Sequence, residues 1–348
     1  MHRFIYWTGF TILVGGFCLW RYESSARVPL PEEVPRPPRD HAVVVKPSTH
    51  FGHFFKSPPK IIPILPASAS LSHRMEPKKT SFEAIANSTH SGTALFQLAE
   101  NPRIYVLDYG SLQVQGQTFN RIAAFIEWQE APKEQVLNDR GLAMLIEHAS
   151  ENPATLFFGH DYRATDLARF FTVAQRSGVV LNEKERALQA LLLDQGFMRA
   201  GKTGFIPIPP EKVLVSIPKE QDDNPQTPQN ESVTWLMRRI ILSHELSHGE
   251  FFTNPDYARY CEEFWHHQLS DAQRKGFIRF LSSAQHYDVH NETLLINEFQ
   301  AYLVYSGTDG TFFRHDAVPD IDETEMLRLR KQFLTHSPAL FKSPQDTI

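Results

Sequence analysis

The stretch "RRIILSHELSHGEFF" (residues 238–252) contains two histidines four positions apart, His244 and His248, with Glu245 directly after the first. In an α-helix, side chains four residues apart lie one above the other on the same face. Two imidazoles in that arrangement can bind one zinc ion. Glu245 is rotated by about 100° around the helix axis, so it can reach a water molecule on the metal. In the motif H-E-x-x-H, the two histidines bind the metal and the glutamate acts as a general base.

The residues around this motif indicate that it lies in a helix. The preceding segment "VTWLMRRIIL" (233–242) places its apolar side chains on the face that carries His244. Ser232 is expected to cap the start of the helix, and Gly249 is expected to end it just after the second histidine. The alternative is an ordinary amphipathic helix whose histidines pack in the core. With 16 histidines in the chain, the motif alone does not decide between the two.

Zinc needs a third protein ligand, and the sequence limits its identity. The two cysteines are Cys18 and Cys261, and Cys18 lies in an apolar N-terminal run. A thiolate zinc site and an intradomain disulfide are therefore both excluded. The longer motif H-E-x-x-H-x-x-G-x-x-H is absent, because Phe251 and Asn254 occupy its last two defined positions. The third ligand must be a histidine or a carboxylate from another segment.

Glu298 is the favoured third ligand. It lies in "LLINEFQAYLVY" (294–305), a predicted helix, on the face that carries apolar residues. An unpaired carboxylate on such a face would cost several kcal/mol unless it found a cation. Glu262 and Glu263, which follow the motif closely, are the alternatives.

The combination of His244-Glu245-x-x-His248 with Asn297-Glu298-x-x-Ala301 on a later helix resembles the gluzincin metallopeptidases. This resemblance implies a zincin-like α+β fold, in which a small twisted sheet lies over the active-site helix and the C-terminal half is mainly helical. It also implies a zinc ion held by the two histidines and Glu298, and hydrolysis of peptide bonds with Glu245 as the base.

The resemblance implies two further features of the site. Many gluzincins carry an aspartate four residues after the glutamate ligand, and Tyr302 stands at that position here, where it is a candidate catalytic residue. The substrate peptide is expected to pair with an edge strand above the active-site helix, and "KVLVSIPK" (212–219) is the expected edge. A group that stabilises the oxyanion is also needed. The available side chains are Tyr302, Tyr305, His286, Tyr287, His290 and His315.

The rest of the folded region also predicts an α+β fold. Strands are expected at 103–109 and 212–219, and one or two more within 112–128. Helices are expected at 137–150, 164–178, 182–196, 232–249, from 254 onward, near 270–283, 291–306 and 322–334. The expected N-terminal caps are Thr165, Asn182, the Ser270–Gln273 capping box and Asn291. A second histidine pair, His266 and His267, is expected on the surface. The polar segment 158–166 has no assigned role.

The N-terminal part predicts export. Residues 1–26 contain a basic start, an apolar run from Phe4 to Trp20 and small residues before Arg27, as in a signal peptide or a signal anchor. Residues 27–79 are a proline-rich linker, and 80–348 are the metallopeptidase domain. The expected location is periplasmic or extracellular, with or without a membrane tether. A buried N-terminal helix is the alternative for the apolar run.

Composition agrees with a globular enzyme and gives no sign of nucleic-acid binding. The formal net charge is −5, and the chain has no basic cluster. The predicted function is zinc-dependent hydrolysis of a peptide or protein substrate. The alternative is a binding or scaffold protein with structural zinc, which would not need Glu245. A non-protein substrate, or latency imposed by the linker, is a further alternative.

Overall fold

The computed structural model of the chain describes residues 75–128, 131–149, 151–283, 287, 290–305 and 318–338. The predicted signal peptide or anchor (1–26) and nearly all of the predicted linker (27–79) lie outside these residues. The first described strand begins at Lys78. Within the described part of the chain, no helix combines the length and the apolar character needed to cross a bilayer.

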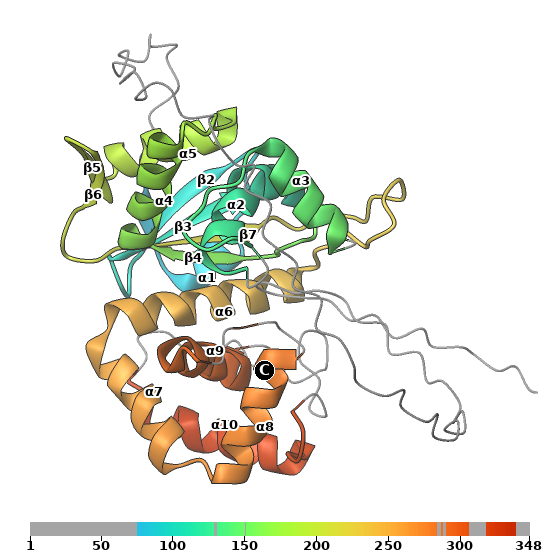
Figure 1. Cartoon of the computed structure of the whole chain (residues 1–348). Helices are drawn as coiled ribbons and strands as arrows, with labels where there is room; N and C mark the ends of the chain where they lie inside the picture. Colours follow the sequence, from blue (N-terminus) through green and yellow to red (C-terminus); the bar gives the residue numbers. More distant parts are fainter. Residues whose placement is uncertain are drawn as a thin grey trace, which may run out of the picture. The chain divides into compact units, whose positions relative to one another are not determined.

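A five-stranded mixed sheet forms the first half of the described region (Figure 1). Its strands, in spatial order, are β1 (Lys78–Thr80), β2 (Ala94–Leu98), β3 (Ile104–Tyr109), β7 (Val213–Pro218) and β4 (His160–Arg163). The β1–β2 and β3–β7 pairs are parallel, whereas β2–β3 and β7–β4 are antiparallel. A separate hairpin joins β5 (Met198–Gly201) to β6 (Gly204–Pro207).

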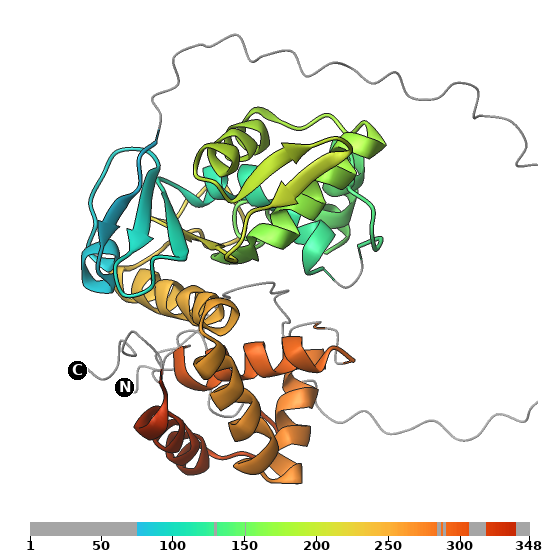
Figure 2. The ribbon, with the colours of Figure 1, turned by 90° about the vertical axis from the view of Figure 1, so that its left-hand side faces the viewer.

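Helices lie on both sides of this sheet (Figure 1, Figure 2). The helices that pack in the sheet half are α1 (Phe82–Ala86), α2 (Leu112–Ile126), α3 (Asp139–His148), α4 (Ala164–Ser177) and α5 (Glu183–Asp194). The second half consists of α6 (Trp235–Thr253), α7 (Pro255–His267), α8 (Asp271–Ser283), α9 (Glu292–Tyr305) and α10 (Glu323–His336). This mixed architecture confirms the α+β class at the coarse level.

Helix α6 is the layer between the sheet and the other C-terminal helices. It packs on β3, β4 and β7 from one side and on α7 and α9 from the other (Figure 2). Successive side chains of β3 point to opposite faces of the sheet. Ile104 and Val106 pack in the core around α6, and Tyr105 and Leu107 pack in the core under α2 and α4. Because α6 is covered on both sides, nearly all of its side chains are buried, and it has no solvated face.

The prediction of strands within 112–128 is wrong, because this segment forms α2. The Ser111 hydroxyl caps the helix by accepting a hydrogen bond from the backbone N–H of Val114. Several polar side chains of α2 are buried and bonded to distant partners, among them Arg121, which donates to Glu185 at 2.7 Å. These buried polar residues interrupt the apolar stripe that would have indicated a helix.

The predicted bounds of α6 also need correction. Thr234, not Ser232, caps its start, with the Thr234 hydroxyl accepting from the N–H of Met237 at 3.2 Å. The helix continues past Gly249 to Thr253. A Cβ atom at Gly249 would lie 2.8 Å from the Ile104 side chain, so this glycine allows α6 to approach β3 closely.

The other predicted helix ends are mostly confirmed. Asn182 forms a capping box with Glu185, the Ser270–Gln273 box is present, and Asn291 accepts from the N–H of Leu294. Thr165 is not a cap, since α4 already begins at Ala164.

A buried ion pair fixes the N-terminal half of α6 to the sheet. The guanidinium of Arg238 contacts both carboxylate oxygens of Asp108 on β3, at 2.7 and 2.6 Å. Arg238 also donates to the backbone oxygens of Ile85, Ala86 and Pro218. Both charged side chains are essentially inaccessible to solvent, so their charges depend on each other.

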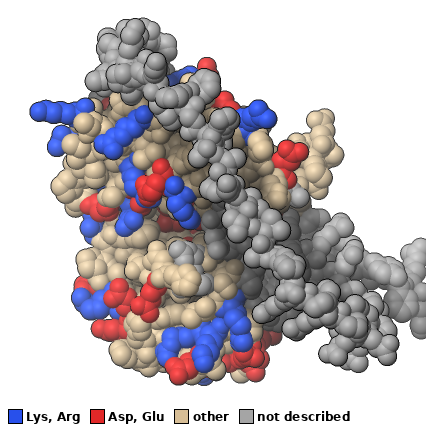
Figure 3. All heavy atoms as spheres, viewed as in Figure 1, with Lys and Arg blue, Asp and Glu red and all other residues tan. Residues whose placement is uncertain are grey.

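Acidic and basic side chains are interspersed on the face of the molecule shown in Figure 3. The described residues visible in this view form no large area of one sign of charge.

Candidate metal centre

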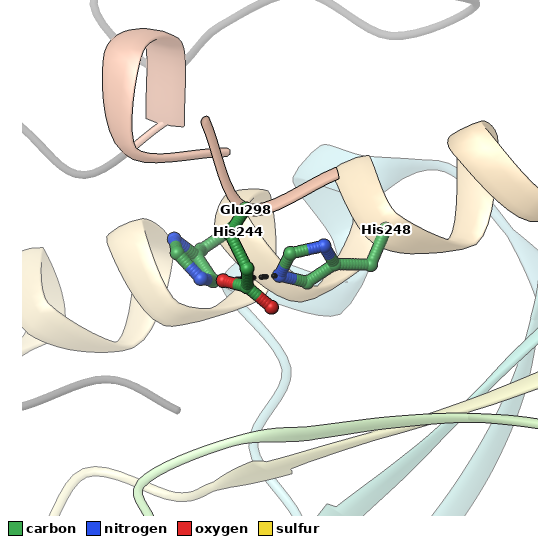
Figure 4. A group of neighbouring side chains, drawn as sticks. All are labelled: His244, His248 and Glu298. Carbon is green, nitrogen blue, oxygen red and sulfur yellow. Dashed lines mark ion pairs between the residues drawn. The ribbon is translucent and has the colours of Figure 1, made fainter. Parts of the chain in front are cut away.

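The structure brings together the three predicted metal ligands. His244 and His248 project from α6, and Glu298 projects from α9 toward both imidazoles (Figure 4). One ligand atom from each of the three lies within 4.8 Å of the other two, and all three side chains are buried. The Nε2 atom of His248 is 3.8 Å from Oε2 of Glu298. This buried His-His-Glu group can hold a metal ion.

Buried hydrogen bonds from α9 to α6 and α7 position Glu298. Gln300, two residues further on α9, donates to the Ser247 hydroxyl at 3.0 Å and accepts from the Tyr257 hydroxyl at 2.6 Å. Ser247 lies directly before His248 on α6. The two helices are therefore held in register at the point where their ligands meet.

The electrostatics of the three ligands fit a site for a cation. Burial, followed by the nearby His248, holds the pKa of His244 well below its usual value. The imidazole is therefore neutral and can act as a metal ligand. Burial raises the pKa of Glu298 to about 7, and its Oε2 has no hydrogen-bond partner among the described residues. A positive ion would stabilise the ionised carboxylate that burial disfavours.

Glu245 lies beside this group and faces the edge strand. Its side chain is 1% exposed, and Oε1 has no hydrogen-bond partner within the described structure. Burial, and then the charge of Asp161, raises the pKa of Glu245 well above its usual value. The carboxylate packs directly against Gly159, where a Cβ atom would lie 2.2 Å from Oε1. Glycine at position 159 thus allows the Glu245 carboxylate to occupy this position.

A cavity of about 290 Å³ opens next to the ligands. Glu245, His248 and Glu298 line it, together with residues from the end of α2, from β4 and from the start of α9. The segment 158–166, which had no assigned role in the sequence, supplies one wall. Because α6, α9 and β4 all contribute, the cavity gives access to the candidate metal site from the sheet side.

Two acidic residues of the cavity were missed by sequence reasoning. Asp161 on β4 places Oδ2 at 3.9 Å from Nε2 of His248. Burial, and then Asp166, raises the pKa of Asp161 well above its usual value. Glu127 follows the last residue of α2, and burial followed by the charge of Asp161 raises its pKa to about 8. No spacing in the sequence connects these residues to the histidine motif.

The edge strand above α6 is β4, not the predicted 212–219. The segment 212–219 forms β7, which pairs with β3 on one side and β4 on the other, so it is interior. The order of strands in a sheet depends on contacts distant in sequence, which explains this error.

The tyrosines near the site differ in position. Tyr302 is 1% exposed, and its ring lies 5.2 Å from that of His244, edge to face. It does not belong to the cavity lining, whereas Tyr287 does. Burial has the largest effect on Glu298 and raises the pKa of its carboxyl group. A hydrogen bond with Tyr287 acts in the opposite direction and lowers that pKa. Tyr302 thus packs behind His244, and Tyr287 faces the cavity.

The remaining candidates lie apart from the site or outside the described residues. Glu262 and Glu263 are exposed on α7, as are His266 and His267, which confirms the predicted surface position of the histidine pair. His290 is exposed and lies two residues before α9. His286 and His315, and the side chain of Tyr305, are not described. The structure thus favours Glu298 over the two alternative carboxylates.

Comparison of the chain with models of protein families, with curated proteins and with solved structures finds no match.

Proposed function

We propose that this protein is a zinc-dependent peptidase of the gluzincin class. The observation that carries the proposal is that His244, His248 and Glu298 form a buried cluster. Glu245 lies beside this cluster, and its carboxylate borders an accessible cavity. Tetrahedral zinc with bonds of about 2.1 Å separates its ligand atoms by about 3.4 Å. The 3.8 Å between His248 Nε2 and Glu298 Oε2 is close to that separation.

The proposed zincin-like fold is supported by the position of α6. It lies under the sheet and carries both histidines, while the third ligand comes from the helical half. We assign the edge role to β4, because it borders the cavity through His160, Asp161 and Arg163. An extended peptide added to this edge would pass over Glu245.

The protein's own groups supply acid–base chemistry and orientation. Bound zinc would polarise the scissile carbonyl and lower the pKa of water. Glu245 then accepts the proton of the attacking water and passes it to the leaving amine. Its position supports this role, because the carboxylate is buried beside the candidate metal ligands and borders the cavity. Tyr287 is the proposed oxyanion donor, since it lines the cavity. Tyr302 is a positioning residue behind His244.

Metal analysis combined with one substitution tests this proposal. The full chain, expressed with zinc, is expected to contain one zinc per molecule and to hydrolyse casein, an unstructured protein. Glu245→Gln should keep the zinc and lose at least a hundredfold in rate, because it removes only the base. The exposed Glu262→Gln is the matched control and should behave as the parent.

Two results would contradict the proposal. Absence of stoichiometric zinc in the parent would exclude the metal site. Full activity of Glu245→Gln would exclude the proposed mechanism. Zinc in both proteins with hydrolysis in neither would favour the alternative, a scaffold protein with structural zinc.

The proposal includes export of the enzyme. It is supported by the apolar run that follows His2 and Arg3 in the sequence. The substrate would then be a periplasmic or extracellular peptide or protein.

A further inference from the structure

The cavity wall carries two carboxylates that the proposed chemistry does not use. Glu127 comes from the end of α2 and Asp161 from β4, so separate elements bring them to one cavity. The pKa of Glu127 is raised to about 8 by burial and by Asp161. Both carboxylates border the same cavity, so a positive group bound there could contact the two together.

The arginines near these carboxylates have other partners. Arg163 directs its guanidinium onto both oxygens of Asp166, at 2.7 and 3.0 Å. Arg169 pairs with Glu134 at 2.5 Å. The third nearby cation, Lys133, is exposed and donates to a backbone oxygen at 3.5 Å.

As a result, neither Glu127 nor Asp161 forms an ion pair with a lysine or an arginine in the described part of the chain. A divalent ion at the ligand group would offset the charges of Glu298 and Glu245. Arg163 acts on Asp161 through space, but its guanidinium is bonded to Asp166. A cation bound beside Glu127 and Asp161 would therefore favour the ionised forms of both carboxylates, which burial disfavours.

A second observation also indicates that a ligand enters this cavity. Oε1 of Glu245 is buried, has no hydrogen-bond partner among the described residues, and belongs to the cavity lining. The adjacent wall at Gly159 carries no side chain. Buried polar atoms in native proteins almost always have a partner, so Oε1 of Glu245 is expected to bond to a water molecule or to a polar group of a ligand in the cavity.

The rest of the lining suits the stem of a long cationic side chain. Phe252, Leu294 and Ile126 contribute apolar surface to the same cavity. Lysine and arginine pack their methylene groups on such surface while the charged end reaches polar groups. A volume of about 290 Å³ lies at the lower end of small-molecule pockets, and it suits one side chain or one chain end.

We propose that Glu127 and Asp161 bind a positively charged group of the substrate, an ammonium or a guanidinium, next to the metal centre. The site therefore selects peptides with a basic side chain or a free amino terminus near the bond that is cleaved. This inference rests on the proposed peptidase function for its catalytic part, but the cation site can be tested by binding alone.

The test uses four short alanine peptides that differ only in positive charge. The first is blocked at both ends and neutral, and the second has a free amino terminus. The third and fourth are blocked and contain one lysine or one arginine. Their affinities for the zinc-loaded full-length Glu245→Gln protein are measured by calorimetry, and their kcat/KM values are measured with the parent. At least one charged peptide should exceed the neutral one by roughly tenfold or more in both measurements.

Variants then locate the selectivity. Glu127→Gln and Asp161→Asn should each reduce the ratio of charged to neutral peptide by roughly tenfold, and the double variant should abolish it. The matched controls are Glu262→Gln and Asp256→Asn, which change exposed carboxylates outside the cavity and should leave the ratio unchanged. The peptide that responds identifies the source of the charge, either the amino terminus or a side chain.

The outcomes separate the two proposals. Equal affinity and equal kcat/KM for charged and neutral peptides would overturn the cation site while leaving the peptidase function in place. A preference that survives in the double variant would overturn it as well. Selective binding of charged peptides that the parent never cleaves would support the cation site and contradict the peptidase function.

Discussion

Replacing Gly159 with alanine should remove most of the hydrolytic activity while leaving the metal in place. The added Cβ atom would lie 2.2 Å from Oε1 of Glu245, 2.6 Å from its Cδ and 2.7 Å from its Cγ. Ordinary van der Waals contact begins near 3.4 Å, so the carboxylate must move by about 1.2 Å. The space available for this movement is the cavity where the substrate is proposed to bind.

The size of the effect follows from this displacement. A misplacement of about 1 Å in a catalytic group can reduce the rate on the order of a hundredfold. The loss of stability should be small, about 1 kcal/mol, because the displaced side chain can enter the cavity and does not crowd the core. None of the three metal ligands is among the nearest atoms to the added carbon, so zinc content should remain at the parental level.

The assay compares casein hydrolysis, zinc content and thermal unfolding in three proteins. The control is Gly178→Ala, where φ is +67° and no atom lies within 4 Å of the added carbon. This control should lose about 1–2 kcal/mol through backbone strain without losing activity. Parental activity in Gly159→Ala would refute the reasoning. Equal loss of activity in both variants would attribute the effect to stability and not to the position of Glu245.

Three further substitutions test the site and the fold. Glu298→Gln should weaken zinc binding roughly a hundredfold or more in a chelator competition, while Glu262→Gln should not; the reverse would exclude Glu298 as a ligand. Arg238→Met removes the arginine charge from buried Asp108, which keeps its contacts with Nε2 of His90 and the Ser88 hydroxyl, and should lower the free energy of unfolding by about 3–5 kcal/mol in urea. A loss below 1 kcal/mol would show that the pair is not stabilising. Burial lowers the pKa of His160 to about 3 from 6.5, so the unfolded chain binds more protons as the pH falls from 7 to 5. This difference should cost the folded state about 2 kcal/mol, and His160→Gln should remove that part of the pH dependence.

The three candidate metal ligands could be identified from the sequence because their signals are local. His244 and His248 are related by one helical turn, and Glu298 stands out because its helix is otherwise apolar. Their convergence in the structure depends on α9 packing on α6. Two local patterns together therefore identified a contact between residues that are 50 positions apart in the sequence.

Helix α2 shows where local patterns fail. Its sequence "LQVQGQTFNRIAAFI" alternates apolar and polar residues at its start, as a strand does. The polar residues are nevertheless buried, because partners from other elements satisfy them. Asn120 donates to the backbone oxygen of Pro153 at 2.8 Å, and a Cβ atom at Gly116 would lie 2.3 Å from that same oxygen. These partners come from a distant loop, so no window of α2 alone could reveal them.

The cavity wall was unpredictable for a related reason. Asp161 reaches His248 only because β4 lies at the edge of the sheet, next to β7. That position is set by pairing across more than 50 residues, for example between Asp161 and Val215. Propensity describes whether a segment extends, and it carries no information about which strand becomes its neighbour.

The buried polar groups of α6 also distinguish a functional site from a structural one, independently of the H-E-x-x-H motif. Glu250, on the same helix, is fully buried, yet its two carboxylate oxygens accept hydrogen bonds from Asn101 and Asn254. Arg238 is satisfied by Asp108 and by backbone oxygens. Oε1 of Glu245, by contrast, is buried without a partner in the described structure and faces a cavity. A buried carboxylate that serves only to stabilise a fold is expected to be paired, as Glu250 is. The unpaired group in a helix whose other charges are paired is therefore the one whose partner comes from outside the chain.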